Sequence, residues 1–188
     1  MSTASPLQPT LWRSCRVLAN RRRLRILELL ADDSELTVSA VAQQLPLPLP
    51  VASQYLRALE ARGFLQAHRR GRHVSYRLSP QRKPTRLQPV VDALRDGFRH
   101  HPGFAEQAFR WATAFTHPRR IALYRALGTG HQTPERLHAA TGISRFALAR
   151  HLAKLAARGF VRRRGERGWA LATPQEALPR ALACLTGG

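Results

Sequence analysis

The stretch YLRALEARGFL at residues 55–65 recurs as HLAKLAARGFV at residues 151–161. Both stretches place apolar residues at helical spacing and then reach Gly63 or Gly159, where the spacing changes. The left-handed residue that ends a helix is usually glycine, because glycine has no side chain to clash in that conformation. Each stretch therefore predicts a helix that ends at its glycine and is followed by extended chain.

The similarity between the two parts of the chain extends further upstream. The sequence ANRRRLRILELL at residues 19–30 matches THPRRIALYRAL at residues 116–127. Self-similarity at a fixed spacing is typical of a repeated structural unit. We therefore predict two tandem domains, at residues 1–100 and 101–188, each large enough for one small helical core.

Cap and turn residues predict the same order of elements in both parts. Asn20 and His117 can each cap one helix, and Thr37 and Thr133 can each cap the next. A tight connection leads to the helix that ends at the glycine, and an alternating hairpin comes after it. Further helices are expected at residues 10–18, 87–100, 104–115 and 175–185. The predicted fold class is mainly α with small β-hairpin wings, built as two tandem winged helix-turn-helix domains.

Composition excludes several classes of protein. The chain has 188 residues, of which 44% are hydrophobic, and no apolar run approaches the roughly 20 residues that cross a bilayer. Its first twenty residues lack the apolar stretch of an export signal, so a cytoplasmic protein is expected. The 31 Lys and Arg residues outnumber the 11 Asp and Glu residues, and the net charge of +20 favours a phosphate-rich polyanion or an anionic membrane surface as the partner.

The order of these elements resembles that of the ArsR-type winged-helix repressors. The resemblance rests on LANRRRLRILELL (18–30), ELTVSAVAQQL (35–45), SQYLRALEARGFL (53–65) and RRGRHVSYRLS (69–79). It covers residues 17–100 and, more loosely, residues 104–185. Members of that family pair as homodimers through their first and last helices. The resemblance therefore implies a monomeric pseudo-dimer with approximate two-fold symmetry, and a homodimer of tandem chains is the alternative.

The chain departs from the metal-sensing members of that family. Where they resemble ELCVCDL, this chain carries Thr37 and Ser39 in place of the thiolate ligands. Asp92, Asp96 and His100 share a helix face that resembles the ligand face of zinc-sensing members, but they also fit a solvated stripe paired with nearby arginines. We therefore predict no metal and no cofactor.

Two sets of residues are candidates for contacts with double-stranded DNA. Outward side chains on the predicted recognition helices can read base edges, because Arg and Gln form paired hydrogen bonds with guanine and adenine. These candidates are Ser53, Gln54, Arg57, Ser144, Arg145, Arg150, His151 and Lys154. Arginines in the wings and in first helical turns can contact phosphates or the minor groove. These candidates are Arg22, Arg23, Arg69, Arg70, Arg72, Arg119, Arg120, Arg162, Arg163, Arg164 and Arg167.

The two predicted recognition helices begin differently. The first begins with the apolar run Leu49-Pro50-Val51, whereas the second begins with Ser144 and Arg145. Val51 can meet thymine methyl groups, or this helix is partly covered by protein and reads nothing. We therefore predict two unequal half-sites, of which the second is bound more strongly by charge.

The remaining motifs narrow the function. Cys15 and Cys184 are expected either as buried small hydrophobes or as a redox pair between the first and last helices. No phosphate-binding glycine loop or metalloprotease motif is present in the sequence, so we predict no enzyme. The leading hypothesis is a sequence-specific DNA-binding transcriptional regulator, a repressor, without a membrane role. The alternative is a winged-helix interaction or architectural module that binds protein, RNA or DNA without sequence preference.

Overall fold

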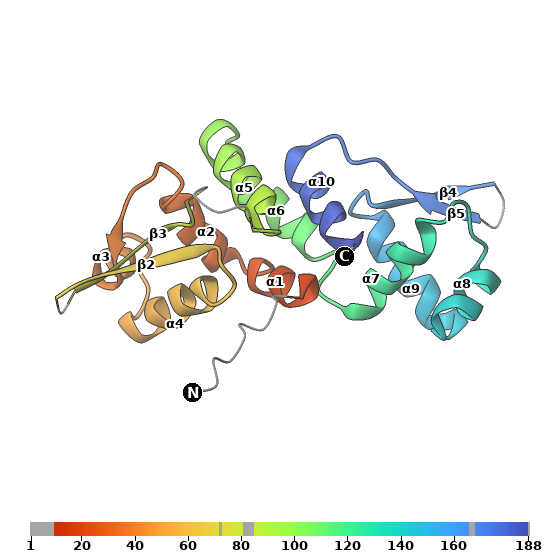
Figure 1. Cartoon of the computed structure of the whole chain (residues 1–188), viewed down its shortest axis with the longest axis horizontal. Helices are drawn as coiled ribbons and strands as arrows, with labels where there is room; N and C mark the ends of the chain where they lie inside the picture. Colours follow the sequence, from red (N-terminus) through yellow and green to blue (C-terminus); the bar gives the residue numbers. More distant parts are fainter. Residues whose placement is uncertain (1–9, 72, 81–84, 166–167, 188) are drawn as a thin grey trace.

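The chain is mainly helical, with two small antiparallel sheets (Figure 1). The computed structural model describes residues 10–71, 73–80, 85–165 and 168–187. The first half contains α1 (Leu11–Leu18), α2 (Arg21–Leu29), β1 (Leu36–Thr37), α3 (Val38–Gln44), α4 (Leu49–Glu60), β2 (Leu65–Arg70), β3 (His73–Leu78) and α5 (Gln88–His100). The second half contains α6 (Phe104–Ala112), α7 (Pro118–Leu127), α8 (Pro134–Thr141), α9 (Arg145–Ala156), β4 (Val161–Arg164), β5 (Gly168–Leu171), α10 (Ala177–Cys184) and the 3-10 helix η1 (Leu185–Gly187). Among the residues described, none of the helices has the length and apolar character that crossing a bilayer requires.

The cap residues and helix-ending glycines predicted from the sequence take those roles in both halves. Each of the four expected cap side chains accepts a backbone N–H from the first turn of its helix; they are Asn20, Thr37, His117 and Thr133. Gly63 and Gly159 have φ values of 78° and 79°, so the chain leaves α4 and α9 through left-handed residues. Both helices are therefore followed directly by a hairpin.

The two hairpins extend toward opposite ends of the long axis of the molecule (Figure 1). In the first, β2 pairs with β3 from Leu65 opposite Leu78 to Arg70 opposite His73. The short strand β1, which the sequence did not predict, adds a third strand beside β3. In the second half a single bridge between Gln132 and Trp169 takes its place. The first hairpin is thus longer and wider than the second.

Each half buries the apolar side of its long helix. Leu56 and Leu59 of α4 are fully buried, and Leu152 and Leu155 of α9 are buried in the same way. Spacings of three and four residues place such side chains on one helix face, as the sequence predicted. The opposite faces of α4 and α9 are left toward solvent.

Helices from the two halves pack together at the centre of the molecule. α6 contacts α1, α2, α5 and α10, and α5 also contacts α10. The first and last helices of the two halves are therefore in contact, and the buried apolar side chains form one continuous cluster. The ring of Phe104 packs edge-on against Phe98, 5.3 Å away between centroids, and against Trp111 at 6.0 Å. Burial of these surfaces holds the halves in one body.

An exposed ion pair adds a second contact between the halves. The guanidinium of Arg21 on α2 donates to both carboxylate oxygens of Glu106 on α6, at 2.7 and 2.6 Å. The same guanidinium lies 4.0 Å from the centre of the Phe109 ring. Both side chains of the ion pair are largely exposed, so the pair fixes geometry more than it adds stability.

The helix α6 ends at Ala112, three residues before the end predicted from the sequence. The carbonyl groups of Thr113 and Ala114 accept hydrogen bonds from the buried guanidinium of Arg120. These side-chain hydrogen bonds satisfy the two carbonyls without a further helical turn, and apolar periodicity does not reveal such contacts.

Replacing Gly97 with alanine tests the contact between α5 and α6. A Cβ at Gly97 would lie 2.2 to 2.4 Å from three atoms of the Phe104 ring. Gly97→Ala is expected to lower the free energy of unfolding by about 1–3 kcal/mol, in urea denaturation followed by circular dichroism, because overpacking outweighs the better helix propensity of alanine. Asp96→Ala, at an exposed neighbouring position, is the control. If Gly97→Ala were equally destabilising in a Phe104→Ala background, the clash would not be its cause.

Candidate nucleic-acid interface

The helix α4 and the first hairpin carry exposed polar and basic side chains. Gln54 and Arg57 of α4 are exposed, and Ser53 is half-buried, with its carbonyl accepting from the Nε of Arg57 at 3.4 Å. Arg69 and Arg70 are exposed where β2 reaches the hairpin turn. The predicted contact residue Arg72 lies outside the described residues.

The second half carries a similar set on α9 and its hairpin. The side chains of Arg150 and Lys154 are exposed, as are Ser144 and Arg145 at the start of the helix. The hairpin arginines Arg162, Arg163 and Arg164 are exposed too. The guanidinium of Arg163 lies 5.2 Å from the centre of the Trp169 ring, which restricts where that charge can go. The predicted contact residue Arg167 lies outside the described residues.

The prediction that His151 faces outward is wrong. His151 is 5% exposed and its ring lies 5.1 Å from that of His117, the cap of α7. Burial, together with the neighbouring His117 and Arg120, lowers the pKa of His151 to about 4. The sequence held a signal for this, because His151 lies three residues after Leu148 and four before Leu155, on the apolar face of the helix. His151 is therefore a packing residue.

The prediction that Arg120 contacts phosphate is also wrong. Arg120 is 7% exposed, and besides the two carbonyls described above it donates to Thr116 Oγ1 at 2.6 Å. Burial lowers the pKa of this guanidinium, and nearby Arg158 lowers it further. The N–H groups of its side chain donate hydrogen bonds to the turn between α6 and α7. Arg120 is thus a structural residue.

The other first-turn arginines differ in exposure. Arg22 and Arg119 are exposed and can reach a partner. Arg23 is half-buried, donates to the carbonyl of Arg16 at 3.1 Å and lies 5.7 Å from the centre of the Tyr55 ring. Its guanidinium is therefore partly committed within the first half, which weakens the case for a phosphate contact there.

Two exposed apolar side chains, which are not among the contacts predicted from the sequence, belong to this surface. Among the described residues, the large hydrophobic side chains that remain exposed are Leu49, at 54%, and Phe146, at 83%. Leu49 is the first residue of α4 and Phe146 the second residue of α9. Pro50 is exposed and Val51 is half-buried, so the rest of the chain covers the start of α4 only in part. The signal available in the sequence was that each helix carries a large apolar residue in its first turn.

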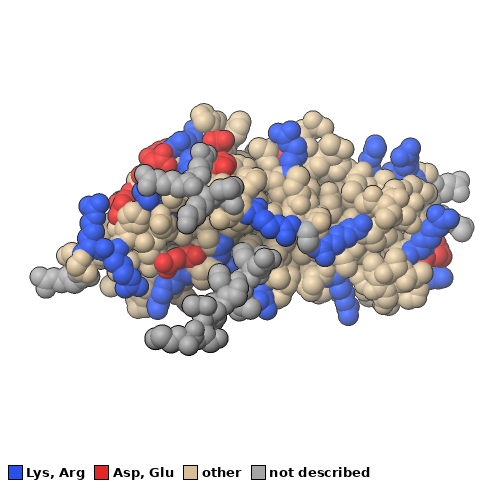
Figure 2. All heavy atoms as spheres, in the orientation of Figure 1, with Lys and Arg blue, Asp and Glu red and all other residues tan. Residues whose placement is uncertain are grey.

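Acidic side chains gather mainly over the first half in the view of Figure 2, and basic side chains appear on both halves. Many of the acids are already paired: Asp33 accepts from Arg99 at 2.7 Å and also lies 3.4 Å from Arg95. The hydrogen bond from Arg99 and the two positive charges lower the pKa of Asp33. These pairs lie on α5 and the chain before β1, so they do not neutralise the arginines of the hairpins.

The candidate metal-ligating residues of α5 make hydrogen bonds or ion pairs within this helix. Asp92 forms an ion pair with Arg95 at 3.1 Å, and Asp96 offers its carbonyl to the ring of His100. In the described part of the chain, no three His, Cys, Asp or Glu side chains cluster in a way that would hold a metal ion.

The two cysteines are both free. Cys15 is fully buried on α1, whereas Cys184, the last residue of α10, is exposed. Burial raises the pKa of the Cys15 thiol strongly, which disfavours the reactive thiolate. This environment is that of a packed small hydrophobe and argues against the redox pair.

Comparison with known proteins identifies the first half. Residues 21–69 match the model of the IclR helix-turn-helix domain, a different family from the one that the sequence analysis named. Over 81 residues the chain is 38% identical to the HTH-type transcriptional regulator Rv0324 of Mycobacterium tuberculosis. That match covers 43% of this chain and 35% of the relative, so the chain spans about a third of the relative's length. The first half thus contains a helix-turn-helix domain of the kind found in DNA-binding transcriptional regulators.

Two solved structures resemble about half of the chain. Reduced HlyU from Vibrio cholerae is 29% identical, with a TM-score of 0.37, and the match covers 46% of this chain and 84% of HlyU. The homodimeric winged helix-turn-helix domain of Mb0332 from Mycobacterium bovis, described as a possible ArsR-family regulator, is 30% identical, with a TM-score of 0.41. That match covers 54% of this chain and 93% of the Mb0332 fragment.

The buried His151 predicts a pH-dependent stability. Its pKa is about 4 in the folded chain, compared with 6.5 for an ordinary histidine, so the unfolded chain binds a proton that the folded chain does not. The free energy of unfolding should therefore fall as the pH is lowered from about 6.5 to 4. His151→Leu should reduce this slope by up to about 1.4 kcal/mol per pH unit, in urea denaturation at a series of pH values. Exposed His101→Leu is the control, and equal slopes in His151→Leu and the parent would contradict the assignment.

Proposed function

We propose that this chain is a sequence-specific transcriptional regulator that binds double-stranded DNA and acts as a repressor. The observation that carries the proposal is that each half has exposed arginines both on its long helix and on the hairpin that follows it. Arg57 on α4 and Arg150 on α9 lie on the solvent side of their helices, and each helix is followed by a hairpin with exposed arginines. In winged-helix proteins such a helix enters the major groove while other basic side chains contact phosphates.

In this proposal the two halves are tandem winged helix-turn-helix domains, residues 1–100 and 101–188. α4 and α9 are the recognition helices, and the hairpins are the wings. The proposal is supported by the match of residues 21–69 to a helix-turn-helix domain and by the repeated order of elements. A cytoplasmic, non-enzymatic role follows from the same assignment.

One chain would then supply both half-site readers. The contacts of α1 with α6 and of α5 with α10 join the first and last helices of the two domains, as a homodimer interface would. The wings extend toward opposite ends of the molecule, which suits contacts to phosphates on both flanks of a site (Figure 1). We therefore favour a monomeric pseudo-dimer over a homodimer of tandem chains.

The exposed Leu49 and Phe146 add an apolar component to base reading. The first turn of a recognition helix faces the base edges, where the one apolar group is the 5-methyl group of thymine. Leu49 and Phe146 occupy that turn in the two halves and remain exposed. Each half-site should therefore contain a thymine near the helix start, flanked by bases that Gln54, or Arg145 and Arg150, can read.

The proposed function is tested by salt-titrated binding to the DNA immediately upstream of the protein's own gene, with an unrelated duplex as competitor. A preference on the order of a thousandfold is expected for a specific site. Arg69→Ala with Arg70→Ala should weaken binding to both duplexes and reduce the salt slope by about 2. Arg180→Ala, an exposed arginine of α10, is the matched control. Equal affinity for both duplexes would instead favour the interaction or architectural module.

Thymine reading is tested by replacing thymine with uracil in the selected site, which removes only the methyl groups. Binding of the parent chain should weaken about threefold to tenfold for each contacted methyl, in fluorescence anisotropy titrations. Phe146→Ala should lose affinity for the thymine duplex and lose sensitivity to uracil in the second half-site.

Leu49→Ala should show the same behaviour in the first half-site, which provides an internal control for Phe146→Ala. If uracil weakens the parent and both variants equally, Leu49 and Phe146 do not contact the methyl groups.

A further inference from the structure

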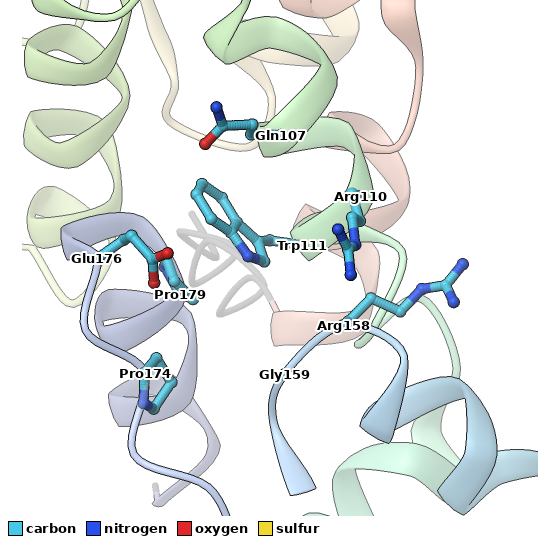
Figure 3. Close-up of a pocket in the computed structure, with 8 residues that line it drawn as sticks. All are labelled: Gln107, Arg110, Trp111, Arg158, Gly159, Pro174, Glu176 and Pro179. Carbon is cyan, nitrogen blue, oxygen red and sulfur yellow. The ribbon is translucent and has the colours of Figure 1, made fainter.

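A cavity of about 430 Å³ lies between α6, the C-terminal end of α9 and the N-terminal end of α10 (Figure 3). Its walls include Gln107, Arg110, Trp111, Arg158, Glu176 and Pro179. This volume lies within the range of pockets that hold small organic molecules. The cavity is separate from the exposed faces of α4 and α9 and is not used by the proposed function.

The first half closes the corresponding space with a leucine. Leu87 is the N-cap residue of α5, is 8% exposed, and its Cδ2 would lie 3.7 Å from a Cβ on Gly63. In the second half the N-cap residue of α10 is Glu176, and a Cβ on Gly159 would meet nothing within 4 Å in the described part of the chain. The apolar side chain of Leu87, which fills this space in the first half, is thus replaced in the second half by the carboxylate of Glu176, which lies beside an open space.

Opposite charges flank the aromatic wall of the cavity. In Figure 3 the carboxylate of Glu176 and the guanidinium of Arg110 lie on opposite sides of the indole ring of Trp111. The side chain of Glu176 is exposed, makes no hydrogen bond or ion pair with the other described residues, and does not cap α10. Arg110 donates through Nε and Nη2 to the carbonyl of Ala157, at 3.2 and 2.7 Å. Its Nη1 group has no partner among the described residues.

A second guanidinium contributes to the positive side. Arg158 donates through Nε to Thr113 Oγ1 at 2.9 Å. Burial lowers the pKa of Arg158, and the charge of Arg110 lowers it further. Hydrogen-bond acceptors of a ligand would therefore be favoured near these two arginines.

These charges select the class of ligand. A ligand whose only charge is a carboxylate would be attracted by Arg110 and Arg158 but repelled by Glu176, and a ligand whose only charge is an ammonium group would meet the opposite pair of forces. A neutral flat ring avoids both penalties if it presents hydrogen-bond donors to Glu176 and acceptors to Arg110. Guanine has this combination, since N1–H and the N2 amino group donate while O6 and N7 accept, and Arg is a common partner of O6 and N7. Its ring can also stack on Trp111, because every base has a flat face for stacking on an aromatic side chain.

We propose that this cavity is a binding site for a neutral guanine-type heteroaromatic molecule, with Glu176 holding its donor edge, Arg110 its acceptor edge and Trp111 its face. The site is formed by the second half alone, because Leu87 fills the equivalent space in the first. Arg110 also reaches the C-terminal end of α9 through the carbonyl of Ala157, so a bound molecule would contact the support of that helix.

The test is isothermal titration calorimetry of the full-length chain with guanosine in the absence of DNA, so that its outcome does not depend on the proposed function. A dissociation constant on the order of 100 µM is expected for a molecule with about 20 non-hydrogen atoms. Adenosine has the same ribose and a similar ring but lacks adjacent donors for a carboxylate, and should bind at least tenfold more weakly. Absence of binding by guanosine, or equal binding of the two nucleosides, would overturn the proposal.

Variants at Glu176 locate the binding. Glu176→Leu reproduces the leucine of the first half and should abolish guanosine binding while thermal unfolding stays at or above that of the parent chain. Glu176→Gln keeps the shape, removes the charge and one acceptor, and should weaken binding about tenfold. Gln175→Leu, at the exposed neighbouring position outside the cavity wall, should bind as the parent does. Unchanged affinity in Glu176→Leu would show that guanosine binds elsewhere and would overturn the assignment.

Discussion

The apolar contact of α6 with α1, α2, α5 and α10 holds the two halves in one body. α6 has only nine residues, yet its buried face, which includes Phe104 and Ala108, joins a core that continues through both halves. Its exposed face carries Glu106, which pairs with Arg21, and Arg110, which reaches the end of α9. Displacing α6 would expose apolar surface and break these polar links together, so the positions of both hairpins depend on it.

Local signals predicted most of the secondary structure, because each acts within a few residues. A cap side chain such as that of Asn20 or Thr133 accepts a hydrogen bond from a backbone N–H in the first turn of the helix that it begins. Gly63 adopts a left-handed conformation that is unfavourable for residues with a side chain. Such effects need no knowledge of the rest of the chain. The strand β1 was missed because its two residues are held by pairing with β3, nearly forty positions later in the sequence.

The candidate interface was predicted less completely, because exposure depends on tertiary neighbours. Arg120 resembles the exposed Arg119 in sequence, but its guanidinium fills a site made by the end of α6. Phe146 was not predicted as a contact because an apolar residue in a helix usually belongs to the core. In the folded chain its side chain is exposed to solvent. His151 was the exception, since its spacing from Leu148 already placed it on the buried face. Residue type alone therefore identified the charged side chains correctly. Whether a side chain is accessible could be predicted only where the helical spacing of its apolar neighbours was also considered.

The contacts of α1 with α6 and of α5 with α10 lie within one polypeptide, and this changes how the pair of halves assembles. Two separate subunits must meet, so the fraction that is paired falls as they are diluted. Here the connection through residues 101–103 keeps the partner helices at a high effective concentration whatever the amount of protein present. The paired arrangement is thus available from the first molecule synthesised, and its abundance rises in direct proportion to expression.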